Sequence, residues 1–259
     1  HLQGFLSMEG VAAAKGELFA ALPADGVAII NATEPWVESW QRVNAAGKNY
    51  FFNGENSDVH ARQVDGNVTV TTPRGDFSLQ LPLPGEHNLS NALAATAVCL
   101  ALGVSLADIK RGLEAVKPVP GRLSMMTTAG GWTIIDDTYN ANPASLYAAL
   151  QVLADQGNEA WLVIGDMLEL GTDSRKMHAE MADAARSLGV KRLFAVGEAT
   201  AATVVAFGNG AVHFEDKETL IEALCSQLEP GVTCLVKGSR SMGMEQVVNA
   251  IANGQELHG

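Results

Sequence analysis

The feature that most constrains the fold is a regular alternation of apolar strands and helices in the second half of the chain. Four short apolar runs predict buried strands, at 132–135, 161–164, 192–196 and 233–236. The segments between and after them have helical periodicity and begin near Pro143, Ser174, Ala199 and Lys217. This alternation predicts an α/β domain with a doubly wound, mostly parallel sheet, as in Rossmann-like folds.

Ligands bind outside the carboxyl ends of the strands in such sheets. Polar residues and glycines follow the four predicted strands, at 136–140, 165–167, 197–198 and 237–240. A carboxylate at a strand end, such as Asp137, can hold a ribose hydroxyl. Loops are commonly polar for other reasons, but the concentration of polar groups on one edge favours a binding site.

The first 123 residues follow a less regular pattern. We expect helices at 8–22, 88–102 and 105–116, a further helix carrying Trp36 and Trp40, and a strand at 26–30. Several short strands over 48–83 predict an antiparallel insertion or edge. The segment 117–121 contains two prolines and a glycine, so we expect two domains, 1–123 and 124–259.

Composition narrows the function classes. A formal net charge of −12 disfavours nonspecific nucleic-acid binding. Three cysteines without CxxC spacing suggest neither a disulfide framework nor a structural zinc site. The longest apolar run, 92–102, is too short to cross a bilayer, and no signal-peptide pattern is present. We therefore expect a cytoplasmic protein without membrane insertion.

Lys15 follows Val11 by four residues and precedes Phe19 by four, which places its stem on the predicted apolar face of the first helix. Desolvation lowers the pKa of a lysine, and a neutral amine can react with carbon dioxide to form an anionic carbamate that ligates a metal. A snorkelling structural lysine is the alternative, and spacing alone favours it.

Other candidates carry weaker signals. Arg122 lies at the predicted domain junction, where a guanidinium could reach phosphates or form a structural ion pair. Asn88 and Asn91 open a predicted helix, where capping is the simpler explanation. The sequence has no G-x-x-x-x-G-K-[ST] phosphate-binding loop.

Taken in order, these segments resemble the Mur ligases. The resemblance runs nearly end to end and rests on these segments: His1-Leu2-Gln3-Gly4-Phe5, Gly10-Val11-Ala12-Ala13-Ala14-Lys15-Gly16-Glu17, Gly85-Glu86-His87-Asn88-Leu89-Ser90-Asn91, Val119-Pro120-Gly121-Arg122-Leu123 and Asp136-Asp137-Thr138-Tyr139-Asn140-Ala141-Asn142-Pro143. The later segments Gly165-Asp166-Met167-Leu168-Glu169-Leu170-Gly171 and Val236-Lys237-Gly238-Ser239-Arg240-Ser241 look like the members that add D-alanyl-D-alanine.

The resemblance implies the later part of a central ATPase-type α/β domain followed by the acceptor-binding domain, with the phosphate loop upstream of His1. It implies ATP and Mg²⁺ as cofactors, with His1 and a carbamoylated Lys15 at the metal. The nucleotide contacts would be Asn91, Arg122, Asp137 and Tyr139. The substrate contacts would be Asn140, Asn142, Lys237, Ser239 and Arg240.

The implied reaction joins D-alanyl-D-alanine to UDP-N-acetylmuramoyl-tripeptide through an acyl phosphate, and the present chain is expected to be inactive alone. Three alternatives stay open. One is a Mur-type ligase with another acceptor, and a second is a relative of the folylpolyglutamate synthases, which share the Pro-Gly-Arg junction. The third is a noncatalytic nucleotide-binding module.

Overall fold

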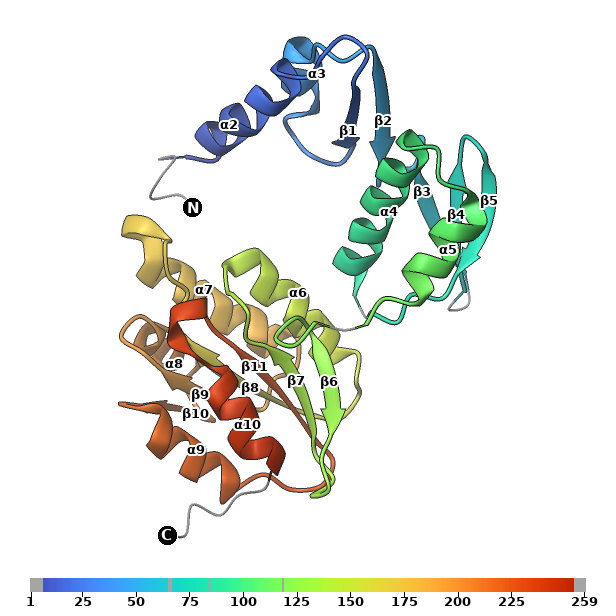
Figure 1. The fold of residues 1–259 in the computed structure, drawn as a ribbon. Coiled ribbons are helices and arrows are strands. Elements are labelled where there is room, and N and C mark those ends of the chain that lie inside the picture. Colours follow the sequence, from blue (N-terminus) through green and yellow to red (C-terminus); the bar gives the residue numbers. More distant parts are fainter. Residues whose placement is uncertain (1–6, 65–66, 84, 118, 254–259) are drawn as a thin grey trace. The chain divides into compact units, whose positions relative to one another are not determined.

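A computed structural model describes residues 7–64, 67–83, 85–117 and 119–253 (Figure 1). The chain divides into two compact units, 1–117 and 118–259. The change of pattern expected near Leu123 lies just inside the second unit.

The second unit is built on a six-stranded sheet with the order β10-β9-β8-β11-β7-β6 (Figure 1). Its strands are β6 (Ser124–Thr127), β7 (Thr133–Asp137), β8 (Glu159–Gly165), β9 (Arg192–Val196), β10 (Ala211–Phe214) and β11 (Val232–Lys237). Neighbouring strands run parallel, except that β6 is antiparallel to β7. The prediction of a mostly parallel sheet is therefore confirmed.

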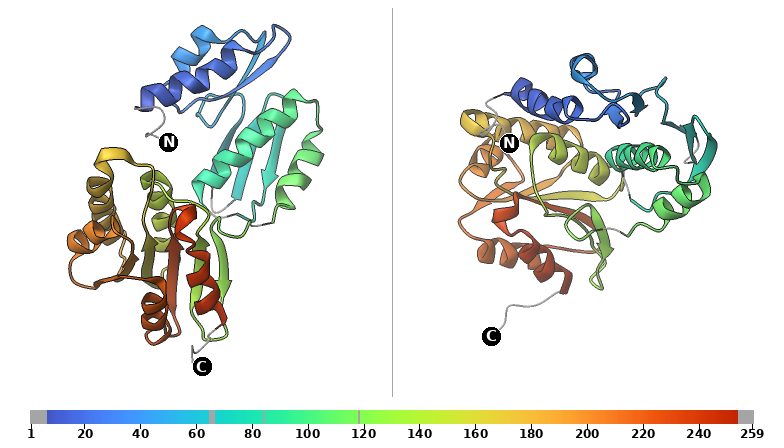
Figure 2. Two further views of the ribbon diagram at one scale, coloured as in Figure 1. Left: turned by 60° about the vertical axis from the view of Figure 1, so that its left-hand side comes forward. Right: turned by 45° about the horizontal axis from the view of Figure 1, so that its top comes forward.

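Helices cover both faces of this sheet, as Figure 2 shows. One face carries α6 (Pro143–Ala154), α7 (Ser174–Ser187) and α8 (Thr200–Phe207), and the other carries α9 (Lys217–Cys225) and α10 (Glu245–Asn253). Successive strand residues point to opposite faces, so Ile135 joins the core under α6 while Ile134 joins the core under α10. The sheet is thus doubly wound, as predicted.

The connections around β11 diverge to opposite faces, as they do at the switch point of doubly wound sheets. β11 lies between β7 and β8. The chain leaves β7 and β8 towards α6 and α7 on one face, but it leaves β11 towards α10 on the other. Ligands bind where neighbouring connections diverge in this way, outside the carboxyl ends of the strands.

The described part of the first unit contains two smaller sheets. The strands β1 (Val27–Asn31) and β2 (Lys48–Phe52) pair in parallel. The strands β3 (His60–Val64), β4 (Asn67–Thr72) and β5 (Gly75–Leu79) form an antiparallel meander. The expectation of antiparallel strands over 48–83 is confirmed for β3 to β5 and wrong for β2.

Four helices complete the described part of the first unit: α2 (Met8–Ala20), α3 (Val37–Val43), α4 (Glu86–Ala101) and α5 (Leu106–Glu114). Ser105 caps α5 as predicted, since its Oγ accepts the backbone N–H of Asp108 at 3.2 Å. α4 begins at Glu86 with Gly85 as its N-cap residue, so neither Asn88 nor Asn91 is the N-cap. Trp36 is the N-cap residue of α3, and Trp40 is buried.

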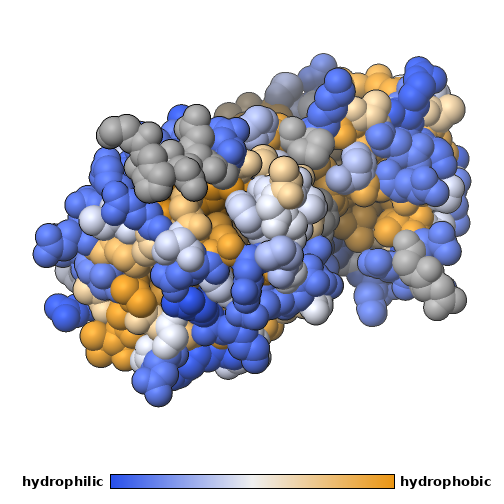
Figure 3. Space-filling view, turned by 90° about the horizontal axis from the view of Figure 1, so that it is seen from below, coloured by the Kyte–Doolittle hydropathy of each residue, from blue (hydrophilic) through white to orange (hydrophobic). Residues whose placement is uncertain are grey.

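Within the described residues, no helix is long and apolar enough to span a bilayer. Polar and apolar residues are interspersed on the face drawn in Figure 3.

Candidate functional site at the strand ends

A buried ion pair joins the carboxyl ends of β7 and β11. The Lys237 side chain is almost completely buried, and its Nζ donates to Asp137 Oδ2 and, at 2.9 Å, to the backbone oxygen of Asn140. Burial lowers the pKa of Lys237, while the neighbouring Asp137 carboxylate opposes that shift. The second oxygen of Asp137 accepts the backbone N–H of Leu123 at 3.2 Å. Both predicted site residues are therefore engaged in holding the loops at this edge.

Asp136, which sequence analysis did not single out, holds the adjoining loop. Its buried carboxylate accepts the backbone N–H of Gly121 at 2.9 Å and both the N–H and the hydroxyl of Thr138, at 3.2 and 2.7 Å. Gly121 has a φ of +77°, and a Cβ there would lie 3.0 Å from the backbone nitrogen of Tyr139. Only glycine suits this position without strain.

This arrangement presents Arg122 and Tyr139 together at the surface. Both are exposed, and the Arg122 guanidinium carbon lies 4.0 Å from the centroid of the Tyr139 ring. An exposed cation stacked on an aromatic ring offers charge for phosphate and a flat face for a base. The structure thus brings together three of the four predicted nucleotide contacts: Arg122, Tyr139 and Asp137.

Asn140 and Asn142 have local roles in the loop that leads into α6. The Asn140 side-chain oxygen accepts the backbone N–H of Ala141 at 2.9 Å. Asn142 caps α6 in a reciprocal capping box with Ser145, and Pro143 occupies the first helical turn. Both asparagines are exposed, so the predicted substrate contacts remain sterically open.

Ser239 and Arg240 follow β11 and differ in exposure. Ser239 is 5% exposed; its N–H donates to the backbone oxygen of Asp166 at 3.0 Å and its Oγ accepts the N–H of Leu168 at 2.7 Å. The Arg240 side chain is 65% exposed and lies 3.4 Å from Glu245. Ser239 therefore links the loop after β11 to the loop after β8 through hydrogen bonds, whereas the exposed Arg240 side chain can contact a ligand.

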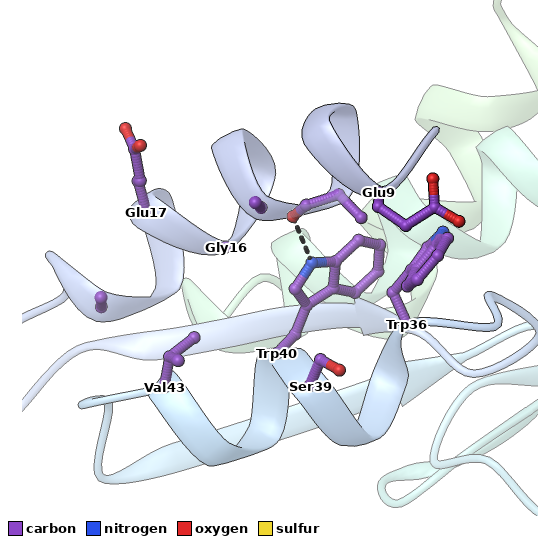
Figure 4. A pocket seen from close by; sticks show the side chains of 10 residues that line it. Glu9, Gly16, Glu17, Trp36, Ser39, Trp40 and Val43 are labelled. Carbon is purple, nitrogen blue, oxygen red and sulfur yellow. Dashed lines mark hydrogen bonds between the residues drawn. The ribbon is translucent and has the colours of Figure 1, made fainter. Parts of the chain in front are cut away.

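The structure corrects the prediction that Lys15 points into an apolar face. Lys15 is exposed, and the buried residues of α2 are Ala12, Gly16 and Phe19. The small residues Ala12 and Gly16 allow α3 to approach, and the Trp40 indole donates to the backbone oxygen of Ala12 at 2.8 Å (Figure 4). The predicted apolar stripe included Leu18, which is 66% exposed. The predicted stripe was therefore displaced by one position from the face that is buried.

A hollow of about 410 Å³ lies between α2 and α3 (Figure 4). Its lining is largely apolar, with Ala13, Trp36 and Val43 among its residues and Lys15 absent. The polar residues Glu9, Glu17 and Ser39 also line it, but no Lys, Arg or His does, and Glu9 and Glu17 belong to no group of three metal ligands among the described residues.

The predicted metal site is not assembled by the described residues. His1 lies outside them, and no three His, Cys, Asp or Glu side chains in the described part of the chain come together as metal ligands. Asn91 is exposed on α4. The roles of His1, Lys15 and Asn91 stay predictions that rest on the family resemblance.

Comparison with known proteins decides the family. The model of the Mur ligase middle domain matches residues 1–99, and that of the Mur ligase glutamate ligase domain matches residues 121–240. The chain belongs to the Mur ligase family. It is 44% identical to the UDP-N-acetylmuramoyl-tripeptide–D-alanyl-D-alanine ligase of Escherichia coli and 36% identical to that of Haemophilus influenzae, over 97% of this chain in both cases.

A crystal structure of MurF from Acinetobacter baumannii has a TM-score of 0.88 and 33% identity over 98% of this Mur ligase chain. The chain spans 57%, 56% and 57% of the E. coli, H. influenzae and A. baumannii proteins, respectively. The comparisons therefore confirm both the family and the mixed α/β fold.

Proposed function

We propose that this chain forms the acceptor side of an ATP-dependent ligase that adds D-alanyl-D-alanine to UDP-N-acetylmuramoyl-tripeptide in peptidoglycan precursor synthesis. The observation that carries the proposal is the 44% identity over 97% of the chain to a relative named for that reaction. The polar edge at the carboxyl ends of β7, β8 and β11 provides the surface on which an acceptor could bind.

The reaction has two steps. The terminal carboxylate of the tripeptide attacks the γ-phosphorus of ATP, which gives an acyl phosphate and releases ADP. The free amine of D-alanyl-D-alanine then attacks the acyl carbon, so that an amide bond forms, phosphate leaves and the amine loses a proton. Both steps bring anions together and need positive charge close to the phosphates.

The second unit supplies positive charge locally, although the whole chain has a net charge of −12. Arg122 is exposed at the strand ends and stacked on Tyr139, and Arg240 is exposed beyond β11. Lys237 is buried and neutralised by Asp137, so its part is to hold the β7 and β11 ends together. Magnesium, when bound, would shield the phosphate oxygens, but the described residues do not supply a ligand set for it.

The proposal includes the cytoplasm as the place of action and excludes nucleic acid as a partner, because the net charge of −12 opposes the approach of a polyanion.

The test is an ADP-release assay on the complete enzyme that carries this sequence, with UDP-N-acetylmuramoyl-tripeptide and three acceptors in turn: D-alanyl-D-alanine, D-glutamate and diaminopimelate. We expect turnover with the dipeptide alone. Turnover with a single amino acid would assign a different Mur-type reaction. Nucleotide binding without turnover on any acceptor would favour the noncatalytic module.

A further inference from the structure

The hollow between α2 and α3 is lined by an aromatic side chain that needs no polar partner from a ligand. Trp40 is almost completely buried, and its ring lies 5.6 Å from that of Phe19. Its indole N–H donates to the backbone oxygen of Ala12 at 2.8 Å. Because this donor is satisfied, Trp40 offers the hollow apolar surface. The volume of about 410 Å³ is within the range of small-molecule sites.

Small residues on α2 keep the hollow open. Ala13 and Ala20 line it, and Gly16 lies between them without a side chain. A Cβ on Gly16 would lie 3.4 Å from Trp40 Cδ1 and 3.8 Å from Val43 Cγ2. Val43 itself is 48% exposed. Apolar surface that water reaches in this way favours a ligand with an apolar body.

Two carboxylates of α2 stand at opposite ends of the hollow. Figure 4 shows Glu9 beside Trp36 at one end and Glu17 at the end where Val43 lies. Both glutamates are exposed, and neither forms an ion pair with another described residue. Hydrogen bonds from its own backbone N–H and from the Ser7 hydroxyl lower the pKa of Glu9. Both ends of the hollow therefore carry negative charge at neutral pH.

Positive side chains are absent from the described lining. It contains no Lys, Arg or His, and the exposed Lys15 of α2 does not belong to it. On α3, the Arg42 guanidinium donates to the Ser39 hydroxyl at 3.1 Å, whereas both carboxylates are on α2. Charge complementarity thus favours a ligand that is positive at each end and apolar between them.

The spacing of the two carboxylates sets the length of such a ligand. Glu9 and Glu17 are eight residues apart on one helix, which corresponds to about 12 Å along its axis. An extended diamine with an eight-carbon spacer covers about the same distance. An ammonium group at the Glu9 end would also lie near the Trp36 ring, where a cation–π contact adds to the ion pair.

We propose that this hollow binds a linear aliphatic diamine or polyamine. Its terminal ammonium groups pair with Glu9 and Glu17, and its methylene chain covers Gly16 and Trp40. Two matched charges select for length, because a shorter diamine reaches one carboxylate only and a monoamine leaves one unpaired. The inference does not rest on the proposed function, since all the residues involved are in α2 and α3.

The experiment is isothermal titration calorimetry at fixed ionic strength on the complete enzyme that carries this sequence. The probes are 1,8-diaminooctane, 1,4-diaminobutane, octylamine and magnesium chloride. We expect saturable binding of 1,8-diaminooctane with a Kd of about 1 mM or tighter. The short diamine and octylamine should each bind about fivefold more weakly or worse, and magnesium should not compete.

Two results with the wild type would overturn the inference. Octylamine that binds as tightly as the diamine would show an apolar site without a role for the second carboxylate. Failure of the complete enzyme to bind 1,8-diaminooctane would show that the hollow is not available, as when another part of the protein covers α2 and α3.

Charge variants test the two ends separately. Glu9→Gln and Glu17→Gln should each weaken binding of the diamine about fivefold, and the double variant should bind the diamine and octylamine alike. The matched control is Glu38→Gln, because Glu38 is exposed on α3 but does not line the hollow. Control binding should stay within twofold of wild type. An equal loss in Glu38→Gln would reduce the effect to general negative charge and contradict the site.

The variant Ala13→Leu tests the hollow itself, because it fills the space and keeps both carboxylates. Alanine and leucine both favour helices, so the melting temperature should stay close to that of wild type. Binding of the diamine should weaken about tenfold, since the leucine side chain takes the place of the methylene chain. Wild-type affinity in a folded Ala13→Leu variant would place the ligand elsewhere and refute the inference.

Discussion

At the scale of single residues, the buried Lys237–Asp137 pair makes the clearest prediction about stability. Asp137→Ala would leave the Lys237 ammonium buried without its partner. Breaking a buried pair on one side costs about 3–5 kcal/mol. We expect a loss of unfolding free energy of that order in urea, and a smaller loss in the double variant Asp137→Leu/Lys237→Met. A single variant as stable as wild type would show that the pair is solvated.

The stability of Asp137→Ala is expected to depend on pH. Burial lowers the pKa of Lys237 from its ordinary value of 10.5, so below 10.5 there is a window in which the unfolded chain binds more protons than the folded one. Stability therefore rises with pH through this window. Removing Asp137 removes the charge that opposes the shift, so the window extends to lower pH. The stability deficit of Asp137→Ala should shrink as pH rises towards 10.5; a deficit that grows would contradict the assignment.

The variant Lys15→Ala is expected to affect activity without affecting stability. Its side chain is exposed, so Lys15→Ala should change the unfolding free energy by no more than about 0.5 kcal/mol. If its carbamate helps to hold magnesium, as the resemblance implies, the same variant should lose most activity in the complete enzyme, and acetate or formate should restore part of it. Near-normal turnover of Lys15→Ala would eliminate the carbamate.

The residue scale also shows where sequence reasoning failed. Spacing alone placed Lys15 inward, because the large side chains of Leu18 and Phe19 outweighed the small Ala12 and Gly16 that form the actual contact. No sequence pattern marks Asp136 or His178. Asp136 accepts the backbone N–H of Gly121, which lies 15 residues earlier, and His178 accepts the backbone N–H of Met167 in the loop after β8. Polar residues at strand ends were correctly predicted as a group, because strand direction alone brings them to one edge.

At the scale of elements, the capping box of α6 offers a second stability test. The Asn142 side-chain oxygen accepts the Ser145 N–H at 2.8 Å. Asn142→Ala should cost about 1 kcal/mol, while Asn142→Ser should keep the cap. Urea unfolding of both variants measures the cap. Activity of Asn142→Ser in the complete enzyme then tests the predicted substrate contact, because that variant loses the carboxamide and keeps the helix.

The first residue of a helix was predictable where a capping side chain precedes it. α6, α7 and α9 begin at the expected residues, and Asn142 and Asp216 cap the first and last of these. The strands β6 and β10 were missed because each has four residues and none of them is buried, so no apolar run marks them. The parallel pairing of β2 with β1 was missed because pairing partners are set by tertiary packing.

At the scale of the whole molecule, each unit has its own hydrophobic cores. The cores on the two faces of the six-stranded sheet draw all their buried residues from the range 123–251. We therefore expect residues 118–259, expressed alone, to unfold cooperatively in urea with the same transition in far-ultraviolet circular dichroism and in tryptophan fluorescence. Noncoincident transitions, or no transition, would show that this unit depends on the rest of the chain.

The measurement that tests the central claim most directly is a mass spectrum of the products. The complete enzyme receives UDP-N-acetylmuramoyl-tripeptide labelled with ¹⁸O in its terminal carboxylate, together with ATP and D-alanyl-D-alanine. An acyl phosphate transfers one carboxylate oxygen to phosphate, so we predict a tripeptide extended by the dipeptide and inorganic phosphate carrying one ¹⁸O. An unchanged tripeptide, or an extended product formed without ¹⁸O in the phosphate, would contradict the account.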